Sequence, residues 1–308
     1  MVGTRMGKIL ASLDIGTNST LFLLAEKHSD GRISPIHHDV RTNDLGRGLG
    51  SDGNLTPETI ELNLRLLRDF RDAAQQAGAA EIRIVATEAL RRAGNAGILI
   101  GRADRELGLH IRVISGEQEA ALTFQGILSG MSDPAMKIIA ADIGGGSSEV
   151  VHGEGGKLLE AKSLPVGAVS MDRKHIRHDP PQSEEIEAVR AEAYEVFRCL
   201  PDTFRANEAD LVICGGTASS LAAADLELLS YQPEKIAGYV MTREGLELFI
   251  HQFSQLSLEE RRRIPGIGWR RAEIILPGTI LISELLRVLG RRQYLTSERG
   301  LRYGLLVE

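Results

Sequence analysis

The chain of 308 residues has only two cysteines, Cys199 and Cys214, and they do not form a CxxC pair. Each lies in an apolar stretch, so we expect reduced, buried thiols and no disulfide. No segment approaches the roughly 18 consecutive apolar residues of a membrane span. The first residues, Met1 to Gly7, lack the long apolar core of a signal peptide. These absences predict a cytoplasmic protein without a membrane partner.

Two further absences narrow the class of protein. The eight histidines form neither an HExxH motif nor a catalytic triad. A net charge of −6 argues against a nucleic acid partner. The charge is uneven, however, because Arg261–Glu308 contains ten Arg, no Lys and four Glu, a balance of +6 that leaves −12 for the rest. Most of these arginines, including Arg261–Arg263, are expected to face solvent, whereas Arg271 is a candidate to face an anionic ligand.

The length is typical of two domains, each large enough to bury its own core. Strand-like and helix-like apolar periods are mixed along the chain, which predicts an α/β fold. The clearest helix has Thr56 as N-cap, Pro57 in its first turn and Gly78 at its end. Other predicted helices cover residues 95–107, segments from 115 and from 183, 242–254, 257–263, 270–289 and 298–306, and predicted strands cover 82–86, 111–114, 158–162 and 210–214.

The domain boundary is predicted near Gly130 to Pro134. This gives an N-terminal domain of residues 1–130 and a C-terminal domain of residues 131–308. The last segment, 298–308, is a candidate to pack back on the first domain.

The most informative pattern is a segment that occurs twice. Asp14-Ile-Gly-Thr-Asn-Ser-Thr20 and Asp142-Ile-Gly-Gly-Gly-Ser-Ser148 match at Asp, Ile, Gly and Ser without a gap. Each copy lies between apolar runs, which predicts strand, turn, strand. Small residues let backbone amides and hydroxyls approach an anion, so the turns are predicted to bind phosphates. A third such turn, Gly215-Gly-Thr217, follows a predicted strand and opens a helix, where amides also bind anions.

Carboxylates accompany the duplicated turns. Asp14 and Asp142 each precede a turn and suit a hydrated Mg²⁺ ion. Glu149 lies at the far end of the second turn, so Asp142 and Glu149 could approach one metal ion from facing strands. The alternative is that Glu149 is an exposed residue at the start of a strand.

Several motifs, taken in order, resemble the exopolyphosphatase and guanosine pentaphosphate phosphohydrolase family. They are Asp14–Ser19, Ser115–Ala120, Asp142–Glu149 and Gly215–Thr217, with further similarity at Thr87–Asn95, Leu164–Ala168 and Ile264–Gly278. The resemblance runs from about Lys8 to the end of the chain. It implies two ribonuclease-H-like domains of the actin-like ATPase superfamily, with an active-site cleft between them.

The resemblance also implies roles for single residues. Glu119 corresponds to the general base, which orients a water molecule and takes its proton. Ser115 and Gln118 fit a capping box, so acidic residues here could instead favour a helix N-terminus. The helix-start role suits Glu117 better than Glu119, because Glu119 lies further from the unpaired amides. Glu117, as a near neighbour, is the alternative candidate for the catalytic role.

Two arginines correspond to phosphate-binding positions of the family. They are Arg91 and Arg271, whose guanidinium groups match phosphate oxygens and stay charged. Their neighbours Arg92 and Arg270 are predicted to be surface residues.

The predicted site combines catalytic, metal-binding and phosphate-binding residues. Its catalytic residues are Glu119, Asp142 and Glu149, its metal ligands are Asp142, Glu149 and Asp14, and its phosphate-binding residues are Gly16, Thr17, Asn18, Ser19, Arg91, Gly144, Gly145, Gly146, Ser147, Ser148, Gly216, Thr217 and Arg271. The expected cofactor is Mg²⁺ or another divalent cation.

The resemblance implies a homodimeric exopolyphosphatase that acts on inorganic polyphosphate, with guanosine pentaphosphate as the alternative substrate. Longer members of the family add a C-terminal helical region, so shorter polyphosphates or a nucleotide are favoured here. Two more distant alternatives are a small-molecule kinase of the same superfamily and a non-catalytic nucleotide-binding scaffold. The kinase is disfavoured because Glu119 suits water, and the scaffold because it would not need Glu119, Asp142 and Glu149 together.

Overall fold

The computed structural model describes residues 7–50, 52–133, 135–205 and 209–308, so Pro134 of the predicted boundary lies outside the described residues. The chain forms two compact units, one of residues up to Ser129 together with Leu301–Glu308, the other of Gly130–Gly300. Among the described residues, no helix combines the length and apolar character that a membrane span requires.

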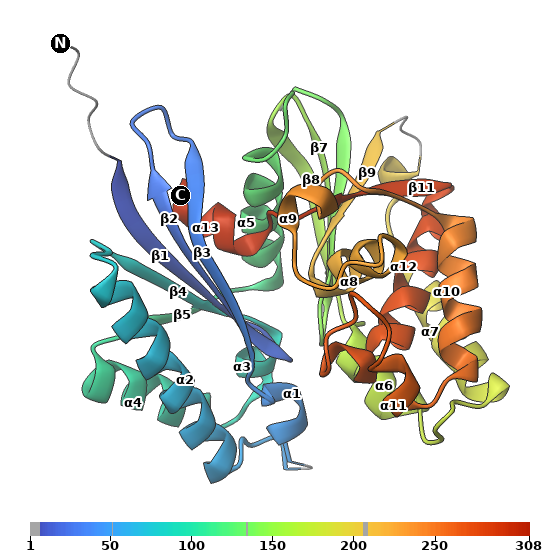
Figure 1. Ribbon diagram of the computed structural model, residues 1–308, viewed down its shortest axis with the longest axis horizontal. Coiled ribbons are helices and arrows are strands. Elements are labelled where there is room, and N and C mark those ends of the chain that lie inside the picture. Colours follow the sequence, from blue (N-terminus) through green and yellow to red (C-terminus); the bar gives the residue numbers. More distant parts are fainter. Residues whose placement is uncertain (1–6, 51, 134, 206–208) are drawn as a thin grey trace. The chain divides into compact units, whose positions relative to one another are not determined.

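The first unit is built on a five-stranded sheet with the strand order β3-β2-β1-β4-β5 (Figure 1). Strands β1 to β3 are antiparallel neighbours, and β4 and β5 extend the sheet parallel to β1. The elements are β1 (Lys8–Ile15), β2 (Ser19–Lys27), β3 (Ile33–Thr42), α1 (Leu45–Gly48), α2 (Pro57–Gln76), β4 (Ile82–Ala86), α3 (Glu88–Arg92), α4 (Ala96–Leu107), β5 (Ile111–Val113), α5 (Gly116–Leu128) and α13 (Leu301–Val307).

Both faces of this sheet are covered, because successive strand residues point to opposite sides. Ala11 and Leu13 of β1 pack in one cluster with α2 and α4, whereas Leu10 packs in another with Leu306 of α13. Helix α2 begins as predicted, with Thr56 as N-cap and Pro57 in its first turn. Its buried side chains include Ile60, Leu64, Leu67 and Phe70. Each large apolar side chain contributes about 1.5–3 kcal/mol on burial.

The second unit is built on a six-stranded sheet with the order β10-β11-β9-β6-β7-β8. Its elements are β6 (Ile138–Ile143), β7 (Ser148–Glu154), β8 (Lys157–Leu164), α6 (Ala168–His175), α7 (Ser183–Phe197), β9 (Asp210–Cys214), α8 (Gly216–Asp225), α9 (Pro233–Ile236), β10 (Val240–Thr242), α10 (Arg243–Gln255), α11 (Leu258–Arg261), α12 (Ile275–Leu289) and β11 (Gln293–Ser297), with 3₁₀ turns at Asp202–Phe204 and Arg271–Glu273.

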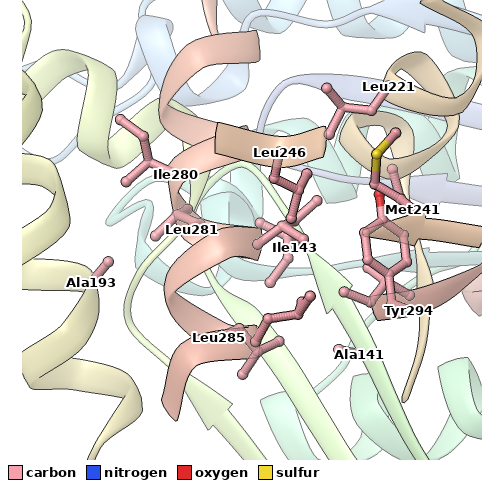
Figure 2. Packing of buried hydrophobic residues seen from close by; sticks show 14 of the residues in the cluster. Ala141, Ile143, Ala193, Leu221, Met241, Leu246, Ile280, Leu281, Leu285 and Tyr294 are labelled. Carbon is pink, nitrogen blue, oxygen red and sulfur yellow. The ribbon is translucent and has the colours of Figure 1, made fainter. Parts of the chain in front are cut away.

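Helix α12 is the centre of the core of this unit. Figure 2 shows Ile280, Leu281 and Leu285 on this helix, near Ile143 of β6 and Tyr294 of β11. All five side chains are at most 3% exposed. This packing fixes the sheet whose strand ends carry the candidate site.

The two sheets repeat one topology. In each, an antiparallel meander (β1 to β3, or β6 to β8) is extended by two parallel strands beside its first strand (β4 and β5, or β9 and β11). The duplicated sequence segment is thus part of a duplicated fold.

Several predictions about elements and burial are wrong. Strands β3, β10 and β11 and helices α3 and α6 were absent from the predicted elements. Strand β3 lies at a sheet edge and carries Pro35 and polar residues, so it lacks a buried strand pattern. The helix predicted over 270–289 starts only at Ile275. Cys199 is exposed, whereas Cys214 is buried as predicted. Arg261 is buried, contrary to the prediction, and its guanidinium donates to Asp179 at 3.3 Å.

Candidate functional site

The two duplicated turns have the same backbone geometry. The amide of Gly16 donates to the carbonyl of Ser19 at 3.0 Å, and the amide of Gly144 donates to that of Ser147 at 3.0 Å. Each turn therefore closes in the same way and joins two antiparallel strands.

Neighbouring segments hold the carbonyls of both turns. In the first turn, Gly16 accepts from the side-chain amide of Asn43 at 2.8 Å, and Thr17 accepts from the amide of Gly46 at 2.7 Å. In the second turn, Gly144 accepts from Ala168 at 2.9 Å and Gly145 accepts from Val169 at 2.8 Å, both at the start of α6. The equivalent carbonyls of the two turns are thus anchored to the protein.

This anchoring determines where the amides of the turns point. In a planar trans peptide the C=O and N–H groups point in opposite directions. The amides of Thr17, Asn18, Gly145 and Gly146 therefore point away from the segments that hold the carbonyls. None of these four amides donates to another group within the described part of the chain. Each turn consequently presents amides that suit an anion such as phosphate.

The second turn alone carries a pair of carboxylates. Asp142 and Glu149 are direct partners across β6 and β7, whereas Asp14 is paired with Leu21 across β1 and β2. Direct partners lie on the same face, with Cβ atoms about 4.5–5.5 Å apart. Glu149 is only 2% exposed and accepts from the Ser163 hydroxyl at 2.7 Å, so the alternative of an exposed glutamate is wrong.

These two carboxylates fit a Mg²⁺ ion. Within the described residues, no group of three or more His, Cys, Asp and Glu side chains is arranged to hold a metal. Mg²⁺ does not need such a group, because it keeps several waters and takes one or two carboxylates beside substrate phosphates. Asp14, the third predicted ligand, is 8% exposed and lies in the other unit.

The third glycine turn lies against Asp142 of this pair. A Cβ atom on Gly215 would lie 2.5 Å from Oδ1 of Asp142, and one on Gly216 would lie 2.0 Å from Nη2 of Arg271. The carboxylate and the guanidinium therefore pack directly on the main chain where α8 begins. Burial lowers the pKa of the Arg271 guanidinium below its ordinary value, and the charge of Asp142 opposes that shift. Arg271 still remains protonated at neutral pH.

The predicted hydroxyl ligands are in different environments. Thr217 is 1% exposed, and its Oγ1 has no hydrogen-bond partner among the described residues. Ser147 is 5% exposed. Ser148 is fully buried and donates to the carbonyl of Val166 at 2.6 Å, so its hydroxyl stabilises the fold.

Glu119 lies near the start of α5. The predicted capping box is present, with Ser115 accepting from the amide of Gln118, and Glu117 is exposed at this end of the helix. Glu119 instead has a side chain only 12% exposed, and it accepts from Nη1 of Arg91 at 2.8 Å.

Arg91 is held from a second side, since the same nitrogen donates to the carbonyl of Ile114 at 2.8 Å. Arg92 and Arg270 are exposed, as predicted.

The structure brings the site residues together within each unit. In the first unit, the Gly16–Ser19 turn, Arg91 and Glu119 follow the carboxyl ends of β1, β4 and β5, which are parallel neighbours. In the second unit, Asp142, Glu149, Gly215, Gly216 and Arg271 gather where β6 and β9 end.

Two residues beside the first turn were not predicted as site residues. Glu88 accepts from the hydroxyl of Thr17 at 3.0 Å and from Arg92 at 2.9 Å. Asn43 holds the carbonyl of Gly16, as described above. Glu88 lies in Thr87–Asn95, one of the segments that resemble the family, so the sequence offered a signal for it. No sequence signal marks Asn43.

The sequence of this chain is similar to those of known proteins. A model of the Ppx/GppA phosphatase family matches residues 24–308. Exopolyphosphatase 1 of Mycobacterium leprae is 27% identical over 303 residues, which cover 97% of this chain and 88% of that protein. Exopolyphosphatase 1 of Mycobacterium tuberculosis is 28% identical over 304 residues, covering 97% and 87%.

Solved structures agree with the sequence comparisons. A Ppx/GppA family member from Aquifex aeolicus is 31% identical and superposes with a TM-score of 0.83, covering 97% of this chain and 96% of that one. An exopolyphosphatase from Cytophaga hutchinsonii is 25% identical with a TM-score of 0.86, covering 96% of each chain. The similarity thus extends over almost the whole chain in both sequence and fold.

Proposed function

This chain belongs to the Ppx/GppA phosphatase family, and from that membership we propose that it is an exopolyphosphatase, which removes the terminal phosphate of inorganic polyphosphate. Membership makes it a phosphoanhydride hydrolase with an actin-like fold. The observation that carries the choice of site is the cluster of Asp142, Glu149 and Arg271 against the Gly215-Gly216 main chain.

That cluster suits a dense polyanion. The outward amides of the second turn, the start of α8 and the Arg271 guanidinium supply positive partial and full charges. These groups are fixed before substrate binds, so little reorganisation is needed when charge develops on the phosphoryl oxygens.

We assign a divalent cation, Mg²⁺ by preference, to Asp142 and Glu149, with Asp14 as a weaker candidate. Such an ion would neutralise phosphate charge. The support from this chain is that Asp142 and Glu149 are register partners on one sheet face.

Glu119 is the proposed general base. In the reaction, the oxygen of a water molecule forms a bond to the terminal phosphorus while the bridging P–O bond breaks, and the carboxylate takes the proton of that water. The support is its sequence position and its sheltered carboxylate, which Arg91 holds in place. Arg91 has five N–H donors, so it can hold Glu119 and still bind a phosphate oxygen.

The test is phosphate release from polyphosphates of several lengths and from guanosine pentaphosphate. Replacing Glu119 with Gln keeps an acceptor for Arg91 but removes the base, so kcat should fall by about 10²–10⁴ while substrate still binds. Chelation with EDTA should stop turnover, and added Mg²⁺ should restore it.

The matched control is Glu117→Gln, at an exposed position of the same helix end. It should keep wild-type kcat. Near wild-type turnover by Glu119→Gln would remove Glu119 from the mechanism. A wild-type protein that releases phosphate only from guanosine pentaphosphate would overturn the polyphosphate assignment.

A homodimer and a cytoplasmic location remain predictions from the sequence. Light scattering on the purified protein would test the first, and cell fractionation the second.

A further inference from the structure

The two duplicated turns differ in what holds them. The carbonyls of Gly144 and Gly145 both accept from main-chain amides of α6. In the first turn, the carbonyl of Thr17, equivalent to that of Gly145, also accepts from a main-chain amide. The carbonyl of Gly16, equivalent to that of Gly144, accepts instead from the side chain of Asn43. One side-chain amide therefore takes the place of a helix amide.

Asn43 is fully buried in the short link between β3 and α1. All of its polar groups are paired inside the first unit. Its Nδ2 donates to the Gly16 carbonyl at 2.8 Å and to Thr20 Oγ1 at 3.1 Å, its Oδ1 accepts from Leu45 at 3.1 Å, its amide donates to Asn18 at 3.1 Å, and its carbonyl accepts from Asn63 at 3.0 Å.

These bonds fix two peptide planes of the turn. The carbonyl of Gly16 shares a plane with the amide of Thr17, so the Asn43 side chain sets the direction of that amide. The main-chain amide of Asn43 holds the Asn18 carbonyl at the other end of the turn. Without the side chain, the plane between Gly16 and Thr17 would lose its anchor and could rotate.

We propose that Asn43 is a positioning residue for phosphate binding. It orients the amides of the first turn toward the substrate. The proposal rests on the proposed function, because the anion is taken to be a polyphosphate. Asn43 itself lies behind the turn and is fully buried, so it acts through the main chain.

The sharpest variant is Asn43→Asp, which has the same shape but replaces the donor with an acceptor. Its carboxylate would face the Gly16 carbonyl and repel it. The KM for tripolyphosphate should rise at least about tenfold, and kcat should stay within about threefold of wild type. Asn43→Ser, which retains one small donor, should show a smaller rise.

Asn95→Asp is the matched control. Asn95 also joins distant parts of the first unit, since it donates to and accepts from the main chain of Leu55 at 2.9 and 2.8 Å. It should lower the melting temperature without changing KM. A role limited to folding would make Asn43→Asp and Asn95→Asp behave alike.

Calorimetric titration of tripolyphosphate separates this inference from the proposed function. A wild-type protein that binds tripolyphosphate but does not hydrolyse it would refute only the proposed function. Equal affinities for wild type and for Asn43→Ser, with both folded by circular dichroism, would overturn the positioning role. Weaker binding by the variant would support it.

Discussion

In the second unit, the side chain of Arg271 packs directly on the main chain of Gly216. The Arg271 guanidinium lies on Gly216, where any side chain would occupy its place. We expect Gly216→Ala to displace Arg271, which would cost about 1.5–3 kcal/mol of phosphate binding and raise KM about tenfold or more. Phosphate-release kinetics measure this directly.

Gly97→Ala is the control, because a Cβ there would contact nothing within 4 Å and Gly97 also lies in the first turn of a helix, α4. It should leave KM unchanged and stabilise the protein by up to about 1 kcal/mol. An unchanged KM for Gly216→Ala would mean that Arg271 is not a substrate ligand.

Single site residues can be predicted from the sequence where their type and motif indicate a chemical role. The glycines, Asp142, Glu149 and Arg271 all belong to recognisable motifs, and the structure gathers them. Asn43 could not be found, because its role depends on the direction of a peptide plane 27 residues away. No spacing or periodicity reports such a contact.

At the scale of elements, the start of α7 offers a test of pH dependence. Glu185 accepts from the amides of Arg177 and Gln182 at 2.8 and 3.0 Å. Burial opposes ionisation, but these bonds and the one from His178 outweigh it and lower the pKa of Glu185 from 4.5 to about 2. The carboxylate therefore stabilises the fold above pH 4.5, and this contribution is lost as the pH falls towards 2.

Thermal melts between pH 5 and pH 2 should show this loss. The melting temperature of wild type should fall more steeply than that of Glu185→Gln, by an amount equivalent to about 1–2 kcal/mol after screening. Glu184→Gln, at the exposed neighbouring position, should follow wild type. Parallel curves for wild type and Glu185→Gln would contradict the assignment.

Long amphipathic helices such as α2 were predictable, because Thr56 and Pro57 mark the start and buried residues recur along one face. Strand β11 was not predictable. Its five residues alternate between buried Tyr294 and Thr296 and the more exposed Gln293, Leu295 and Ser297, and two arginines precede it. Its parallel partner β9 lies some 80 residues earlier in the chain, so only tertiary packing reveals the strand.

At the scale of the whole molecule, two compact units should respond separately to core mutations. Leu306 of α13 packs with Leu10 and Leu23 in the first unit, whereas Leu285 of α12 belongs to the core of the second. Each change to Ala should cost about 2–5 kcal/mol. Hydrogen exchange should show faster exchange in β1 and β2 for Leu306→Ala, and in β6 and β9 for Leu285→Ala.

Uniform loss of protection across all strands in either variant would show that the units unfold as one. Val307→Ala, at a half-buried position beside Leu306, is the milder control and should change exchange little.

Because residues 301–308 complete the first unit, the order of folding cannot simply follow the order of synthesis. The sheet of β1 to β5 is made within the first 113 residues, yet the helix that covers Leu10 and Leu23 leaves the ribosome only after residue 300. Until then Leu10 and Leu23 on this sheet lack the helix that packs on them. A nascent chain stalled before α13 is thus expected to need a chaperone, although the second unit is already fully synthesised.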